Sequence, residues 1–211
     1  MRPQNSNPKS HQGDESAARA RILHAAFGAF VKNGYAAASM LAIATEARVS
    51  KRDLYALVGN KQAMLVACIS ERAKRLQVPA DLPMPDDRDG LAAVLISYGT
   101  QLIREISDPT VIAVFRLAIA EAIQAPEVAT VLDAFGREAS RAALRKIIVA
   151  AQTSGLLEGR NEELTEEFFA LLNGDLMMNL LLRVTQRPTP REMTARAQGA
   201  VERFLVLHPP E

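Results

Sequence analysis

Ser50, Lys51 and Arg52 are the residues whose types and spacing most clearly suggest a chemistry. Ser50 can cap a helix that begins at Lys51, and Asp53 is its capping-box partner. Helix N-termini together with lysine and arginine side chains suit phosphates and the edges of guanine. Asp53 has a second possible role, because a carboxylate can accept a hydrogen bond from a cytosine amino group. The group therefore indicates contact with nucleic acid.

Two short helices must position these side chains. Ser39 can cap the first, Met40 to Ala47, and the second runs from Lys51 to about Leu57. Two short helices joined by a tight turn can place one of them in the major groove of DNA. Small and apolar residues stand where the two helices would meet, at Ile43, Ala44, Ala47, Val49 and Leu54.

The rest of the chain predicts further helices and no strands, so the expected fold is all-α with nine helices. Besides the two short ones, helices are expected at about 16–33, 61–77, 90–107, from 109, and at 126–153, 162–184 and 190–207. Residues 1–15 are polar and contain Pro3, Pro8 and Gly13, which predicts a disordered arm. The expected domains are this arm, a helix-turn-helix domain at 16–61 and a larger helical domain at 62–211.

Composition favours a cytoplasmic protein without a membrane segment. No apolar run reaches the roughly 18–20 residues that cross a bilayer, and Cys68 is the only cysteine among 211 residues. Charge is uneven: residues 1–61 carry a balance of +5, and residues 62–211 carry −4. A basic first third on an acidic remainder is typical of a nucleic-acid-binding module joined to a body with another task.

The chain resembles the TetR family of transcriptional regulators over about residues 21–65. The segments that carry the resemblance are ILHAAFGAF at 22–30, GY at 34–35, SMLAIATEARVSKRDLY at 39–55 and GNKQAML at 59–65. Together with the residue types, the resemblance implies a DNA-binding set made of Ser39, Arg48, Ser50, Lys51, Arg52, Asp53, Tyr55, Asn60 and Lys61.

Two positions depart from the family pattern. Arg48 stands in the turn where the family usually has glycine, and a left-handed conformation there would cost about 1 kcal/mol relative to glycine. Arg48 would in return add a cation near the DNA. Leu57 and Val58 replace an aromatic or histidine pair, so the second short helix is expected to pack differently against the helix that follows.

The larger domain is expected to bind an effector and to form a homodimer. The stretch from Phe168 to Val184 is apolar on all sides, which predicts burial against more than one partner. A two-fold dimer would place two recognition helices roughly 34–36 Å apart on a near-palindromic site in double-stranded DNA. An effector of unknown identity would lie in a cavity lined by Tyr98, Gln101, Phe115, Arg116, Ile119, Asn173, Met177 and Met178.

Three functions remain open on the sequence alone. The leading one is a repressor that a small molecule releases from its operator. The second is a helix-turn-helix regulator that works without an effector. The third is a helical-bundle enzyme, which the lack of any paired acid and base, nucleophile elbow or metal-ligand spacing disfavours. No cofactor, metal or catalytic residue is therefore expected.

Overall fold

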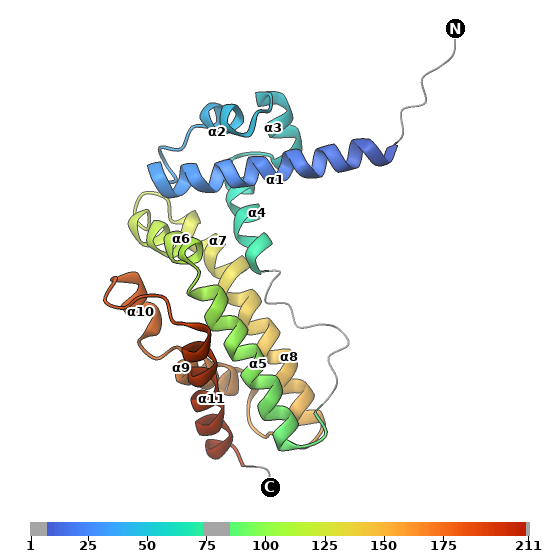
Figure 1. Ribbon diagram of the computed structural model, residues 1–211, viewed down its shortest axis with the longest axis vertical. Coiled ribbons are helices and arrows are strands. Elements are labelled where there is room, and N and C mark those ends of the chain that lie inside the picture. The colour runs from blue at the N-terminus through green and yellow to red at the C-terminus, as the bar shows by residue number, and fades with distance from the viewer. Residues whose placement is uncertain (1–7, 74–84, 210–211) are drawn as a thin grey trace. The chain divides into compact units, whose positions relative to one another are not determined.

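The computed structural model describes residues 8–73 and 85–209, and all regular structure within them is helical (Figure 1). The chain divides into two compact units. The first combines residues 1–71 with residues 117–132, and the second combines residues 72–116 with residues 133–211. The sequence-based boundary after residue 61 differs from this division in two respects. Residues 62–71 belong to the first unit, and so does the segment 117–132, which is distant in sequence.

The first unit begins with four helices, at Pro8–Asn33 (α1), Met40–Ala47 (α2), Lys51–Val58 (α3) and Lys61–Ala73 (α4). Helix α1 packs against both α2 and α3, and Ile22, Phe30, Ile43, Leu54 and Met64 are buried completely or almost so. The expected arm is wrong for residues 8–15, which form the first turns of α1; residues 1–7 lie outside the described chain. The predicted end of α4 near residue 77 also lies outside it.

Residues 117–132 complete the first unit. They comprise the last residues of α6 (Pro109–Ala120) and the short helix α7 (Glu127–Leu132). Val128 and Val131 are buried, and Glu121 joins this segment to the loop after α1 through the backbone N–H of Tyr35. The loop before the helix-turn-helix is therefore held by residues more than 80 positions further along the chain.

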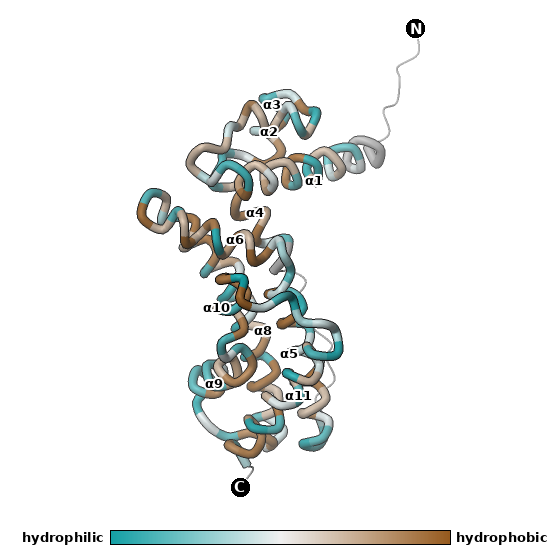
Figure 2. The backbone as a smooth tube through the Cα atoms, turned by 60° about the vertical axis from the view of Figure 1, so that its left-hand side comes forward, coloured by the Kyte–Doolittle hydropathy of each residue, from teal (hydrophilic) through white to brown (hydrophobic). Residues whose placement is uncertain are grey.

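The second unit contains α5 (Arg88–Ile106), the beginning of α6, a π-helical segment at Asp133–Arg137, α8 (Glu138–Thr153), α9 (Asn161–Asn173), α10 (Leu176–Leu181) and α11 (Pro190–Leu207). Helix α11 packs against α5 and α9, and α8 packs against α5 and α9 as well. Phe168, Phe204 and Leu95 are fully buried in its core. Hydrophobic and hydrophilic stretches alternate along these helices (Figure 2), as amphipathic packing requires.

Two of the nine expected helices are divided. The predicted helix at 162–184 breaks at Gly174, whose φ of 46° lies in the left-handed region that favours glycine. The predicted helix at 126–153 is interrupted by the π-helical segment. Over the residues that the structure describes, none of the helices combines the length and the apolar character that a bilayer crossing needs.

Candidate nucleic-acid interface and a cavity in the second unit

Side-chain caps fix the start of each short helix in the helix-turn-helix. The Ser39 hydroxyl accepts from Ala42 N at 3.4 Å and begins α2. The Ser50 hydroxyl accepts from Asp53 N at 3.0 Å and donates to the Asp53 carboxylate at 2.7 Å. Asp53 therefore pairs with Ser50 through one carboxylate oxygen, and its other oxygen remains available as an acceptor.

Arg48 ends α2 in a left-handed conformation, with φ 55° and ψ 47°. Its backbone N–H donates to the carbonyls of Ala44 and Thr45, which closes the last turn of the helix. The side chain is exposed. The turn therefore adopts the left-handed conformation, in which a residue with a side chain is less stable than glycine.

The outer face of α3 presents three exposed side chains of the expected set. Lys51 and Arg52 are exposed, and Tyr55 is 44% exposed. The opposite face carries Leu54, which is fully buried, and Val58, which is 9% exposed. Lys51, Arg52 and Tyr55 therefore remain available to a ligand of the first unit.

Two further members of the predicted DNA-binding set also have side-chain contacts within the protein. The Asn60 side chain accepts from Ala63 N at 2.8 Å and caps α4. The Lys61 ammonium donates to the carbonyls of Tyr35 and Ala36 at 3.1 and 3.0 Å, and it lies 5.4 Å from the centre of the Tyr35 ring. Lys61 thus holds the loop between α1 and α2, which leaves one ammonium hydrogen for another partner.

Acidic residues of the 117–132 segment lie close to the same loop. Glu121 accepts from Tyr35 N at 2.9 Å, and Gly34, with φ 83°, leaves the space that this carboxylate fills. Burial, and then the charge of Glu127, raise the pKa of the Tyr35 hydroxyl. On the other side of the motif, Arg21 donates to the carbonyl of Ala47 at 3.2 Å. These contacts position the two short helices without using Lys51, Arg52 or Tyr55.

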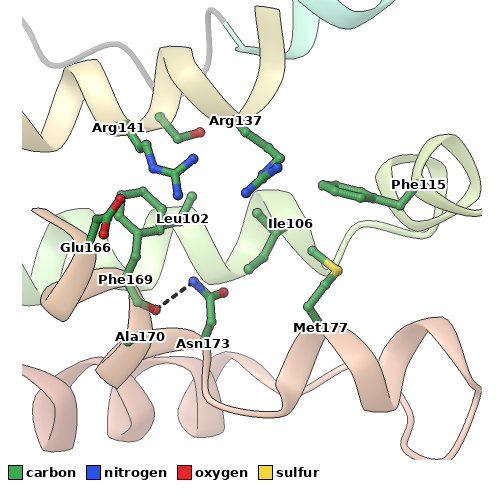
Figure 3. Close-up of a pocket in the computed structure, with 11 residues that line it drawn as sticks. Leu102, Ile106, Phe115, Arg137, Arg141, Glu166, Phe169, Ala170, Asn173 and Met177 are labelled. Atoms are coloured by element: carbon green, nitrogen blue, oxygen red, sulfur yellow. Dashed lines mark hydrogen bonds between the residues drawn. The ribbon is translucent and has the colours of Figure 1, made fainter. Parts of the chain in front are cut away.

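A cavity of about 490 Å³ lies within the second unit, lined by α5, α6, the π-helical segment, α8, α9 and α10 (Figure 3). Its apolar lining is Leu102, Ile106, Phe115, Phe169, Ala170 and Met177. Its polar lining is Arg137, Ser140, Arg141, Glu166 and Asn173. The volume and the mixture of apolar walls with a few polar groups are typical of a small-molecule site.

The structure brings Phe115, Asn173 and Met177 of the predicted ligand set to this cavity. Tyr98 lies behind it: its buried hydroxyl donates to the carbonyl of the lining residue Ser140 at 2.8 Å. Burial raises the pKa of that hydroxyl.

The other four predicted ligand residues are placed elsewhere. The Arg116 guanidinium donates to the carbonyls of Leu180 and Leu181 and so holds α10. Gln101 hydrogen-bonds Glu105 along its own helix. Ile119 belongs to the first unit and is 63% exposed, and Met178 is 58% exposed because the break at Gly174 changes which face of α10 is buried.

Sequence reasoning did not find the charged part of the cavity. Arg137 and Arg141 are four residues apart, so they share a helix face with the lining residue Ser140 between them. That spacing was visible in the sequence. The local sequence does not show that the two arginines face a cavity, because the cavity forms only where α8 packs against α9.

Comparison with known proteins agrees with this arrangement. Residues 22–68 match the family described as bacterial regulatory proteins, tetR family. Residues 93–208 match the C-terminal domain described as that of AefR-like transcriptional repressors. An HTH-type transcriptional repressor of Streptomyces coelicolor is 37% identical over 87 residues, which span 40% of this chain and 44% of that protein. The chain thus matches less than half the length of this curated relative.

Solved structures extend the similarity to nearly the whole chain. A TetR transcriptional regulator from Agrobacterium tumefaciens has a TM-score of 0.76 at 27% identity, covering 92% of this chain and 95% of its own. The Flavonoid-responsive Regulator FrrA has a TM-score of 0.74 at 27% identity, covering 92% and 98%. With a family match over each of its two parts, the chain belongs to the TetR family of bacterial regulatory proteins, which are DNA-binding regulators of transcription.

Proposed function

We propose that the protein is a homodimeric transcriptional repressor that a small molecule releases from its operator. The observation that carries the DNA-binding part is the face of α3, where Lys51, Arg52 and Tyr55 are exposed while other residues hold the motif in place. Cations on a recognition helix bind phosphates and guanine edges, and a tyrosine hydroxyl can donate to a phosphate. Binding to chromosomal DNA would place the protein in the cytoplasm.

The test is binding to DNA from the protein's own promoter region at about 0.15 M salt, compared with unrelated DNA of the same length. We expect tighter binding to the promoter DNA, and a loss of affinity in Lys51→Ala, Arg52→Ala and Tyr55→Phe. Lys146→Ala, an exposed lysine on α8, is the matched control and should bind as the unmodified protein does. Equal affinity for both DNAs would refute the proposal.

A dimer is supported by apolar and small residues that face solvent near the C-terminus. Met178 and Leu182 are 58% and 65% exposed, and Val206 is 75% exposed. Gly199 lies inside α11, where glycine costs about 0.5–1 kcal/mol relative to alanine, yet a Cβ there would meet only the Arg203 side chain, at 3.7 Å. Packing within one chain does not require this glycine, but the close approach of a helix from a second copy would.

Effector release is supported by the cavity of the second unit and by its size. One protein of similar fold is named as flavonoid-responsive, which supports regulation by a small molecule here. A ligand that preferred the non-binding arrangement of the dimer would shift its population away from DNA. A thermal-shift screen across metabolites should find at least one that raises the melting temperature and lowers operator affinity.

A further inference from the structure

The geometry points to an amphipathic organic anion as the ligand of the 490 Å³ cavity: one anionic group held by Arg141 and Arg137, on a hydrophobic body. This inference rests on the proposed function of the cavity as the effector site. The inference extends that proposal by specifying the charge and the polarity of the effector.

Arg141 is the centre of the argument. Its guanidinium carbon lies 5.7 Å from the centre of the Phe169 ring, and Phe169 is itself a wall of the cavity. A cation–π contact with a ring uses the charge of a guanidinium and leaves its N–H groups free to donate. Among the residues that the structure describes, no carboxylate lies within ion-pair distance of Arg141. A half-buried cation with open donors is suited to a carboxylate or a similar anion.

Arg137 reaches the same space from the end of the π-helical segment, one turn before Arg141 (Figure 3). One of its N–H groups donates to Asp133 at 2.9 Å, in an exposed pair. A guanidinium has five donors, so the remaining ones can serve a second acceptor. The two arginines therefore both present donors to the cavity, and Figure 3 draws Arg137 between Arg141 and Phe115.

The opposite lining is apolar and suits the body of such a ligand. Phe115 and Met177 lie on the far side of the labelled group from Arg141 and Glu166, with Ile106 between (Figure 3). The amide nitrogen of Asn173 is used by the carbonyl of Phe169, at 2.9 Å. The side-chain oxygen of Asn173 stays available as an acceptor, which a hydroxyl on the ligand could use.

Glu166 is the group that opposes an anion, because its exposed carboxylate lines the same cavity. Its effect on the ligand has the opposite sign to that of Arg141. Replacing the two residues separately therefore gives a paired test: Arg141→Gln should weaken the binding of an anion, and Glu166→Gln should strengthen it.

The experiment measures calorimetric affinities of the full-length protein for matched probes. The aromatic arm uses 4-phenylbenzoate and biphenyl-4-methanol, and the aliphatic arm uses decanoate, decan-1-ol and decylamine. We expect at least one acid to bind about tenfold more tightly than its alcohol, and decylamine to bind more weakly than decanoate. Whichever arm shows this preference identifies the ligand body as aromatic or aliphatic.

The variants then assign the preference to residues. Arg141→Gln should reduce the ratio of acid to alcohol affinity about tenfold while the alcohol changes little, and Glu166→Gln should raise that ratio about twofold or more. Lys146→Gln, a cation on α8 outside the cavity, should leave the ratio unchanged. An equal affinity of acids and alcohols, no binding of any probe, or an unchanged ratio in Arg141→Gln would overturn the inference.

Failure of this inference is distinguishable from failure of the proposed function. Operator binding by the unliganded Arg141→Gln and Glu166→Gln proteins should match that of the unmodified protein, because neither residue belongs to the helix-turn-helix. If only neutral probes bind and cause the protein to release its DNA, the proposal of an effector-controlled repressor stands and the inference of an anionic ligand is refuted. If the protein binds its promoter DNA no more tightly than unrelated DNA, the proposed function is refuted, whatever the affinities of the probes.

Discussion

Arg48 shows how a single residue can serve two opposed demands. Its backbone has φ 55° and ψ 47°, where a residue with a side chain is less stable than glycine by about 1 kcal/mol. Its side chain is exposed in the turn directly before the recognition helix. Strain kept at such a place is consistent with a functional gain from the guanidinium.

We therefore expect Arg48→Gly to raise the free energy of unfolding by about 1 kcal/mol and to weaken operator binding. If Arg48 contacts a phosphate, the slope of log affinity against log salt should fall by about 1. Chemical denaturation and binding at several salt concentrations measure the two effects. Arg48→Ala is the control, because it removes the cation and keeps the strained conformation. Glycine and alanine variants of equal stability would contradict this account.

Residue roles that depend on local chemistry could be predicted from the sequence, and roles that depend on distant packing could not. Ser39 and Ser50 act as caps because a cap needs only the three residues that follow it. Lys61 remains in the predicted DNA-binding set, but its local sequence did not show that its ammonium donates to carbonyls 25 and 26 residues earlier. The arginines of the cavity were missed for the same reason.

Helix boundaries, too, could be predicted where they depend on local residues and not where they depend on distant packing. The starts of α5 and α11 have strong local signals, since Asp87 and Thr189 accept from backbone N–H groups three residues on. The break at Gly174 was missed because the residues on both sides continue an apolar pattern, and a glycine within such a run can remain helical. The π-helical segment has no simple periodic signal, so its position follows from packing.

The capping box of α11 predicts a pH effect on stability. Hydrogen bonds from the Thr189 backbone and hydroxyl lower the pKa of the Glu192 carboxyl below its ordinary value of 4.5. A carboxyl whose pKa falls on folding stabilises the fold fully above its unfolded-state pKa and loses that contribution as the pH falls through its folded-state pKa. Glu192→Gln should therefore lower the melting temperature near pH 6.

The difference between the two proteins should shrink as the pH is lowered below about 4. Thermal denaturation at a series of pH values between 3 and 7 would show this convergence. Glu202→Gln, at an exposed position on the same helix, is the matched control and should give no such trend. A constant difference between Glu192→Gln and the unmodified protein across this range would argue against the capping interaction.

The loop between α1 and α2 allows a second test at the scale of elements. A Cβ at Gly34 would lie 2.7 Å from Glu121 Oε1, and its φ of 83° disfavours any side chain. Gly34→Ala should displace the carboxylate from Tyr35 N and lower the free energy of unfolding by about 2 kcal/mol or more.

Glu121→Gln, which keeps an acceptor for Tyr35 N, should lower the free energy of unfolding by less than half as much. Urea denaturation measures both variants. An alanine variant that is as stable as the unmodified protein would show that the Glu121 contact does not hold this loop.

At the scale of the whole molecule, the proposed dimer makes a prediction about Gly199. Gly199→Leu should improve the helix by removing glycine, yet block the close approach of a second copy. We expect a folded protein of monomeric mass with much weaker operator binding, measured by sedimentation and by DNA titration. Gly28→Leu is the matched control, because a Cβ at Gly28 in α1 would meet nothing within 4 Å. A Gly199→Leu protein that stays dimeric would place the interface elsewhere.

The discontinuity of the first unit decides how its parts can be exchanged. The chain passes between the two units after residues 71, 116 and 132. A hybrid protein joined at one point near residue 71 would receive Tyr35 from one parent and Glu121 from the other, so the hydrogen bond between them would depend on two unrelated sequences. Recombination that keeps a new operator preference intact should therefore transfer residues 117–132 together with the N-terminal segment. The unit that carries the helix-turn-helix is therefore encoded by two separate segments, residues 1–71 and 117–132.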